Sequence, residues 1–231
     1  MDALHLVLVE SAIELVPEAI SGHPSVRAYA RRRGRKGTEV LLDRSFHHAA
    51  MRTLKDAHKR GRPDIAYHVL LDAVDSPLYA AGLLAIHVQT YDGMIVDLGV
   101  GVRLPRSYHR FVGLLEDLYR KGEVRGDGGN VLLRMRRMGL SDLIREISPD
   151  AALLLRERGR PSTMESVAEE LASARRPLVG LGGFPAGDFS EETLGLFREQ
   201  LSVGPRAYSA SLISCRLIYE VERRVLDAAN A

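Results

Sequence analysis

The stretch PLVGLGGFPAGDFS, residues 177–190, carries the pattern that decides the fold. Its first part, 177–184, is an apolar run typical of a strand that is buried on both faces of a parallel sheet. Glycines and Pro185 follow and predict a loop, after which Ser190 is suited to cap a helix over 190–200. The order of strand, loop and helix predicts one unit of an α/β sheet.

The same alternation covers the rest of the second half of the chain. We predict strands over 131–137 and 151–157, helices over 141–148 and 163–174, and a short strand that runs into a long helix within 207–228. Apolar strands that alternate with helices predict a mostly parallel sheet with helices on both faces. The expected fold class is therefore α/β.

The first half of the chain is expected to begin this sheet and then to elaborate it. We predict strands over 4–11 and 38–45, helices over 47–61 and 63–75, a hairpin over 83–98 with an Asp92-Gly93 turn, and a helix from Pro105 to Gly122. Neither a long linker nor an internal repeat separates the halves. The sequence therefore predicts a single domain over 1–231.

Composition limits the class of protein. The chain has 231 residues, of which 45% are hydrophobic, enough to bury a sizeable core. Its apolar runs fall short of the ~20 residues that a membrane span needs, and residues 1–17 lack a basic leader. The one cysteine, Cys215, excludes an internal disulfide and a cysteine-cluster metal site. We expect a soluble, cytoplasmic protein without a membrane partner.

Positive charge is concentrated in a few segments although the net charge is only +2. The basic segments are 27–36, 55–62, 103–110 and 134–137. Such clusters are compatible with a polyanion bound on one face, and a simply solvated surface is the alternative. His47 and His48 are adjacent and point to different faces of a helix, so we expect core and capping roles and no metal site.

Common catalytic and phosphate-binding motifs are missing from the sequence. It contains neither a Walker lysine motif, nor G-x-G-x-x-G after the first strand, nor a G-x-S-x-G nucleophile elbow. What remains is a pair of Gly/Pro-rich loops, 182–190 and 201–211, next to predicted strands. Parallel sheets bind ligands beyond the carboxyl ends of their strands, and two such loops could hold a flat base by main-chain hydrogen bonds. Ordinary loop chemistry is the alternative.

The stretch RGRPD, residues 60–64, places an arginine and an aspartate at the start of a predicted helix. Arg62 precedes a proline, which favours an extended backbone, and Asp64 lies in the first turn, where the helix dipole favours a carboxylate. The two side chains are close enough in sequence for a bidentate ion pair. We interpret Asp64 as orienting Arg62 towards a nucleic acid. The alternative is a plain helix N-terminal charge.

Motifs along nearly the whole chain resemble those of one family. They are LVLVESAIELVP (6–17), HPSV (23–26), LLDRSFHHAAMR (41–52), RGRPDI (60–65), DSPLYAAGLL (75–84), HVQTYDG (87–93), RLPRSYHRFVGLL (103–115), VGLGGFPAGDF (179–189) and LSVGPRAYSAS (201–211). Together they are similar to the ribosome-biogenesis pseudouridine N1-methyltransferases of the SPOUT, or α/β-knot, class. The resemblance implies a homodimer, S-adenosylmethionine as cofactor, and a trefoil knot in the cofactor-binding part, about 150–231.

The activity that the resemblance implies is N1-methylation of a pseudouridine in small-subunit ribosomal RNA, with a role in small-subunit biogenesis. An assembly factor that binds RNA or ribosomal proteins without catalysis is the alternative. The resemblance to the methyltransferases also implies a set of cofactor-binding residues, namely Leu155, Gly182, Gly187, Val203, Gly204, Pro205, Arg206, Ala207 and Tyr208.

The resemblance also implies RNA contacts within about 25–125, made by Arg62, Arg103, Arg106 and Arg110. A helix from Pro105 would place Arg106 and Arg110 on one face. No residue is an unambiguous general base. Asp64 and Arg62 are the catalytic candidates, since an arginine could stabilise a pseudouridine anion, whereas an ion-paired aspartate is a weak proton acceptor.

The predicted C-terminal helix carries apolar residues at steps of four, namely Ile213, Leu217, Val221 and Val225. One face of this helix must pack in the core. The width of the apolar stripe leaves room for a subunit interface as well, and core packing alone is the alternative.

Overall fold

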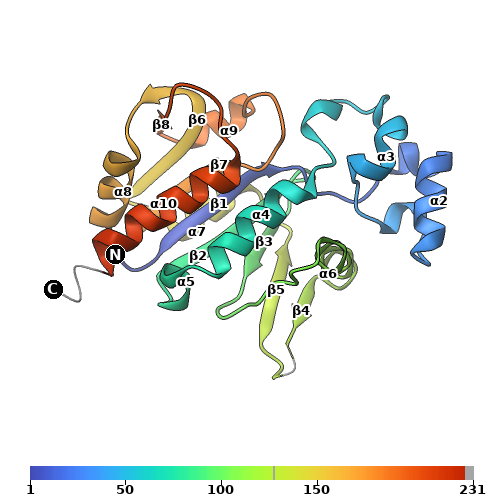
Figure 1. Ribbon diagram of the computed structural model, residues 1–231, viewed down its shortest axis with the longest axis horizontal. Helices are drawn as coiled ribbons and strands as arrows, with labels where there is room; N and C mark the ends of the chain where they lie inside the picture. Colours follow the sequence, from blue (N-terminus) through green and yellow to red (C-terminus); the bar gives the residue numbers. More distant parts are fainter. Residues whose placement is uncertain (127, 227–231) are drawn as a thin grey trace.

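A computed structural model describes residues 1–126 and 128–226. Its centre is an eight-stranded sheet with the order β4-β5-β3-β2-β1-β7-β6-β8 (Figure 1). The strands are β1 (Leu4–Ser11), β2 (Leu84–Thr90), β3 (Ile95–Leu98), β4 (Glu123–Arg125), β5 (Val131–Arg136), β6 (Ala151–Pro161), β7 (Pro177–Gly182) and β8 (Glu199–Ser202).

Most of the sheet is parallel, as predicted. Strands β2, β1, β7, β6 and β8 pair in parallel, and β3, β5 and β4 extend one edge by antiparallel pairing. Residues 6–9 of the central strand β1 form a continuous apolar run because both faces of the strand are covered. Leu6 and Leu8 pack into one core, and Val7 and Val9 pack into another. This confirms the α/β fold class.

Helices cover both faces of the sheet (Figure 1). They are α1 (Glu18–Ser21), α2 (Pro24–Arg32), α3 (Arg44–Met51), α4 (Pro63–Val74), α5 (Pro77–Ala80), α6 (Tyr108–Lys121), α7 (Leu140–Ile147), α8 (Met164–Ser173), α9 (Glu191–Leu196) and α10 (Ala210–Val225), with 3₁₀ turns η1 (Gly37–Glu39) and η2 (Ala57–Lys59). Helices α4, α6, α8 and α10 share the core of Leu6 and Leu8, whereas α7 packs in the core of Val7 and Val9.

Residues 16–61 form a helical lobe that projects beyond the sheet beside the start of α4 (Figure 1). The lobe has a core of its own, which includes Val26, Tyr29, Val40 and Leu42. The sequence pattern indicates a basic segment followed by a strand in this part of the chain. It does not predict α2.

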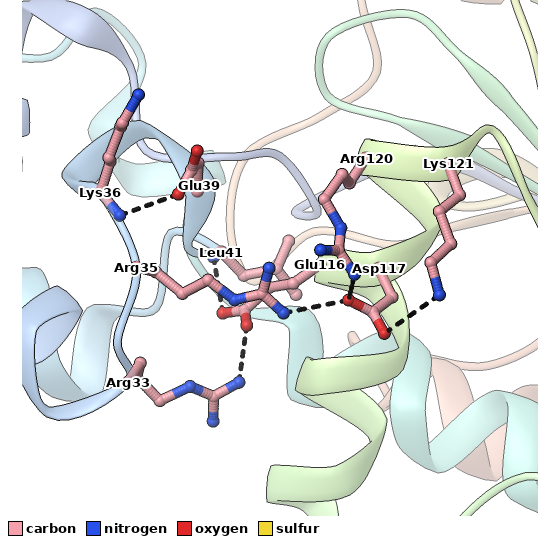
Figure 2. A network of polar contacts seen from close by, with 9 residues as sticks. All are labelled: Arg33, Arg35, Lys36, Glu39, Leu41, Glu116, Asp117, Arg120 and Lys121. Carbon is pink, nitrogen blue, oxygen red and sulfur yellow. Dashed lines mark hydrogen bonds and ion pairs between the residues drawn. The ribbon is translucent and has the colours of Figure 1, made fainter.

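A buried carboxylate fastens the helical lobe to α6 (Figure 2). Glu116 has no exposed side-chain surface, and its two oxygens accept from Arg33 Nη2 at 2.6 Å and from the amide of Leu41 at 3.2 Å. One turn position further, Asp117 accepts from Arg35 at 3.0 Å. Both acidic residues lie on α6, so the orientation of the lobe depends on this helix.

Several predicted boundaries are wrong in the first half. The strand over 38–45 is absent from the structure: 37–39 form η1, and Leu41 makes only an isolated bridge to Leu15. Its apolar residues serve two cores instead of a sheet, since Val40 and Leu42 face the lobe and Leu41 faces the main core. The helix predicted over 47–61 is wrong at both ends: α3 begins earlier because Asp43 caps the amide of Ser45, and it ends at Met51, ahead of the separate 3₁₀ turn η2.

Two other boundaries also need correction. The helix predicted from Pro105 begins at Tyr108, so Arg106 lies outside it and shares no helical face with Arg110. The short strand expected after residue 207 is absent, and the edge strand β8 lies earlier, where a helix to residue 200 was predicted. The predicted end of the last helix, residues 227–228, lies outside the described residues.

Most of the remaining elements agree with the sequence pattern. Strand β1, helix α4 after Pro63, and the β2–β3 hairpin with its Asp92-Gly93 turn are confirmed. Helix α8 is capped by Thr163, and α9 is capped by Ser190 as predicted. The structure also confirms that His47 is a buried core residue, whose Nδ1 accepts from the amide of Asp43.

Replacement of Glu116 by alanine should destabilise the protein by about 2–3 kcal/mol, because hydrogen bonds to charged groups contribute roughly 1.5–3 kcal/mol each. Urea unfolding measures the change. The control is Arg120→Ala on the exposed side of the same helix, for which we expect less than about 0.5 kcal/mol. Equal effects of the two substitutions would contradict the role given to Glu116.

Candidate cofactor cleft and its arginine rim

A cleft of about 820 Å³ opens where β7 and β8 end and where β6 passes beside them. Two loops line it: the first cleft loop, residues 183–190, and the second cleft loop, residues 203–209. The start of α4 forms another wall. The volume lies in the range of roughly 300–1,000 Å³ that is usual for small-molecule sites, and the position is the one that parallel sheets favour for ligands.

The first cleft loop leaves β7 close against the end of β1. The amide of Gly183 donates to Val9 O at 2.9 Å, and Gly183 O accepts from the amide of Ala12 at 2.8 Å. A Cβ at residue 183 would meet Ser11 Oγ at 2.3 Å, so this position requires glycine. Gly187 has a φ of +97°, which side chains rarely tolerate. These two glycines define the path of the loop.

Glu10, at the end of β1, ties the first cleft loop to the helical lobe. Its side chain accepts from the amide of Ser190 at 2.8 Å and from Lys59 Nζ at 2.9 Å, and Lys59 also lies 4.6 Å from the centre of the Phe184 ring. Burial raises the pKa of Glu10, but the hydrogen bonds from Ser190 and Lys59 outweigh it and hold the pKa below its usual value. The backbone of Glu10 is left-handed, with φ 49°, a strained conformation typical of functional regions.

The second cleft loop offers backbone donors. Among the described residues, none accepts a hydrogen bond from the amides at positions 203, 204, 206, 207 and 208. The loop is tight, since a Cβ at Gly204 would meet the Tyr208 ring at 2.4 Å, and the Arg206 guanidinium lies 5.4 Å from the centre of that ring. Free amides beside a glycine suit a polar, planar ligand.

A bulge in β6 forms the floor of the cleft. The pairing of β6 with β8 shifts register between Leu155 and Arg160, and the residues between them turn towards the cleft. Arg156 bonds Gln200 at 2.8 Å and forms an ion pair with Asp188 of the first cleft loop. Arg158 is exposed and has no ion-pair partner among the described residues.

Arg62 and Asp64 form the rim of the same cleft. Arg62 Nε donates to Asp64 Oδ1 at 2.8 Å and Nη2 donates to Oδ2 at 2.7 Å, which confirms the bidentate pair. This pairing raises the pKa of the Arg62 guanidinium above its usual value. The φ of Arg62 is extended at −132°, although its ψ of 60° is not. The guanidinium is thereby held at the entrance of the cleft.

Tyr108 and Asp43 connect this rim to the helical lobe. The Tyr108 hydroxyl donates to Asp43 Oδ2 at 2.6 Å, while the other oxygen of Asp43 caps α3. Burial, together with this hydrogen bond, raises the pKa of the Tyr108 phenol. Both residues interact electrostatically with Arg62. Sequence reasoning missed this contact, although Asp-Arg-Ser at 43–45 is a recognisable helix cap.

The three other predicted RNA-binding arginines do not line the cleft. Arg106 forms an ion pair at 2.6 Å with Asp75, which caps the end of α4 opposite to Arg62. Arg103 and Arg110 are exposed. The expected convergence of these arginines on one helical face is therefore wrong, because α6 begins only at Tyr108.

The predicted cofactor residues gather at the cleft, with one exception. Those that line it are Leu155, Gly182, Gly187, Val203, Gly204, Arg206, Ala207 and Tyr208, whereas Pro205 does not. The structure adds residues without a sequence signal, among them His68 and Ile213. Their functional roles stay predictions.

Within residues 1–126 and 128–226, no helix combines the length and hydrophobicity needed to cross a bilayer. The same residues contain no group of three or more His, Cys, Asp or Glu side chains arranged to hold a metal ion.

A parallel α/β sheet with glycine-lined loops beyond its strand ends defines a small-molecule-binding α/β protein, and comparisons with known proteins narrow the class. The model of the EMG1/NEP1 methyltransferase family matches residues 6–222. A Staphylothermus marinus protein named ribosomal RNA small subunit methyltransferase Nep1 is 40% identical over 221 residues, 96% of either chain. A Pyrococcus furiosus protein of the same name is 43% identical over 202 residues, 86% of this chain and 90% of that one.

A solved structure agrees with these matches. The crystal structure of Archaeoglobus fulgidus Nep1 bound to S-adenosylhomocysteine superimposes with a TM-score of 0.84 and 36% sequence identity, covering 98% of this chain and 99% of the other. The chain belongs to the EMG1/NEP1 methyltransferase family. This confirms the resemblance that the sequence motifs indicated.

Replacement of Glu10 by glutamine should loosen the first cleft loop, because it weakens charge-assisted hydrogen bonds to Lys59 and Ser190. We expect hydrogen exchange of the amides in 184–190 to accelerate about ten-fold or more, since ~1.4 kcal/mol corresponds to a factor of ten. Mass spectrometry of exchanged peptides measures it. In the exposed control Glu191→Gln these rates should stay unchanged, and unchanged rates in Glu10→Gln would refute the account of the loop.

Proposed function

We propose that this protein transfers the methyl group of S-adenosylmethionine to N1 of a pseudouridine in small-subunit ribosomal RNA. The observation that supports this most is the position of Arg62, a guanidinium held by a carboxylate, on the rim of a cleft lined by free backbone amides. Membership of the methyltransferase family supports it too, as does the S-adenosylhomocysteine bound by Archaeoglobus Nep1.

The residues of the cleft fit such a cofactor. Backbone amides of the second cleft loop lack protein acceptors among the described residues and are available to the edge of an adenine. The glycines allow a ligand to approach the main chain closely. Arg158 and Glu157 offer unlike charges for the amino-acid part. When bound, S-adenosylmethionine supplies an activated methyl group on its sulfonium.

On the RNA side, Arg62 is placed to stabilise negative charge on the target base. Pseudouridine N1 must lose its proton before it can act as a nucleophile, and a guanidinium at the cleft entrance favours the resulting anion. Both oxygens of Asp64 are engaged by Arg62, so we assign Asp64 an orienting role and no role as general base. The base must be extruded from its stack to enter the cleft, where alignment with the methyl group contributes further.

Arg103, Arg106 and Arg110 are proposed to bind RNA outside the cleft. Arg103 and Arg110 are exposed, and the ion pair of Arg106 with Asp75 is exposed as well, so RNA phosphates can displace it at little cost. Affinity should therefore fall with salt, with a log–log slope of roughly 0.7 for each phosphate contacted in single-stranded RNA.

The wider assembly is also part of the proposal. We propose one methyltransferase domain over 1–231, with RNA-contacting elaborations within about 25–125 and a knotted cofactor-binding part at about 150–231. The protein acts as a cytoplasmic homodimer in the biogenesis of the small ribosomal subunit. Ribosomal proteins are further candidate partners. The exposed Leu212 and Tyr219 on α10 support a subunit interface there. Sedimentation equilibrium measures the oligomeric state.

Mass spectrometry of small-subunit ribosomal RNA from cells that lack the protein tests the activity. We expect one methylated pseudouridine to disappear, and an unchanged modification profile would defeat the proposal. Calorimetry with S-adenosylhomocysteine distinguishes the alternative of a non-catalytic assembly factor, which should show no heat of binding.

Arg62→Ala and Asp64→Ala should each weaken RNA binding about ten-fold or more, in line with the ~1–3 kcal/mol expected for a base-contacting arginine. Cofactor affinity should not change, because the cofactor is held by the two cleft loops. Fluorescence anisotropy and calorimetry measure the two affinities, with Arg145→Ala on α7 as control. Equal loss of cofactor binding would mean that the site is drawn wrongly.

A further inference from the structure

The helical lobe presents an aromatic ring to solvent. Phe46, on α3, is 36% exposed, and one side of its ring stacks on Tyr29 of α2, with ring centres 4.5 Å apart and planes inclined by 29°. His47 packs edge-on against Tyr29 at 5.0 Å and is itself buried. The orientation of the Phe46 ring is therefore supported from below, while part of its surface stays open.

Arginine side chains surround this aromatic pair. Arg32 and Arg33 follow Tyr29 by three and four residues on α2, which places them on the same helical face. Arg33 lies 5.9 Å from the centre of the Tyr29 ring, and the charges of both arginines act on the Tyr29 phenol. Arg32 is exposed and has no ion-pair partner among the described residues. The open Phe46 ring and the free Arg32 guanidinium thus both belong to the surroundings of Tyr29.

The aromatic pair is linked indirectly to the rim of the cleft. Asp43 accepts from Tyr108, which neighbours Arg62, and the same aspartate caps the helix that carries Phe46. The Tyr108–Asp43 contact therefore links Arg62 on the rim to the helix that carries Phe46. Figure 1 shows the lobe beside the start of α4.

The contacts in Figure 2 hold the lobe that carries Phe46 against α6. Arg33 and the amide of Leu41, both in the lobe, bind the buried Glu116 of α6. Arg33 thus has two functions, since it borders the aromatic pair and anchors the lobe. A platform held in this way costs little conformational entropy on binding.

We propose that Phe46 and Arg32 form a stacking platform for one nucleotide of single-stranded RNA that flanks the target base. The base stacks on the open part of the Phe46 ring, and Arg32 pairs with the adjacent phosphate. Aromatic rings and arginines are what single-stranded RNA sites use, because every base has a face that can stack. This inference rests on the proposed function and extends it to a second RNA contact.

The charge around Phe46 favours RNA over a protein partner. Helix α2 carries Arg27, Arg31 and Arg32 and no acidic residue. A protein-docking site would need a contiguous apolar patch of some hundreds of Å², whereas here one ring lies among cations. A single base is the occupant that matches this surface.

Phe46→Trp tests the platform directly, because the chain contains no other tryptophan. We expect the oligonucleotide rU15 to quench the fluorescence of the introduced tryptophan in a saturable manner. The midpoint of this quenching should equal the midpoint of binding measured by the fluorescence anisotropy of labelled rU15. Phe46→Ala should weaken rU15 binding about ten-fold, the range that loss of one stacked base predicts. Arg32→Ala should weaken it as well, and Phe46→Trp should retain it. The control Val100→Ala, another exposed apolar position, should leave it unchanged.

Tryptophan fluorescence that does not respond when anisotropy shows rU15 fully bound would overturn the platform, and so would unchanged affinity in Phe46→Ala. Unchanged affinity in Phe46→Ala would indicate that the exposed Phe46 ring contacts a protein partner instead of RNA. Urea midpoints of all variants confirm folding. Failure of the proposed function is recognised separately, by absence of S-adenosylhomocysteine binding in calorimetry, which Phe46→Ala should not alter.

Discussion

The carboxylate of Glu10 is the contact on which the rest of the site depends. It stands at the end of the central strand and binds the start of α9 through Ser190 and the helical lobe through Lys59. Its left-handed backbone turns the chain where β1 leaves the sheet. The Glu10 side chain thus fixes the position of the first cleft loop relative to the segment that leads into Arg62. The strain at Glu10 is offset by charge-assisted hydrogen bonds from Lys59 and Ser190.

The cleft separates two kinds of recognition. Its inner part is built from glycines and free amides, which bind by hydrogen bonds and impose shape. Its rim and the neighbouring lobe carry guanidiniums and aromatic rings, groups whose chemistry suits phosphates and bases. Such a division suits a protein that binds a small methyl donor in one geometry for each reaction and receives a long, charged substrate from solvent.

Much of the fold could be predicted because it follows from local patterns. Apolar strands, the cap at Ser190, and Gly182 and Gly187 at the strand end all have signals within a few residues. The failures arose where tertiary contacts override such signals. The segment around Leu41 has strand composition, yet its side chains divide between two cores. The carbonyl of Arg106 accepts from the Tyr67 hydroxyl and lies ahead of α6, within the helix that was predicted to start at Pro105. Glu10 and Phe46 had no signal, because their partners are distant in sequence.

The central claim is that the second cleft loop binds the methyl donor through its backbone. A ¹⁵N–¹H correlation spectrum recorded during titration with S-adenosylhomocysteine tests it most directly. The account predicts large, saturable shifts for the amides of Val203, Gly204, Arg206, Ala207 and Tyr208, with small shifts in α2 and α3. Saturable binding that leaves the resonances of these amides unshifted, and shifts those of another part of the sheet instead, would contradict this claim.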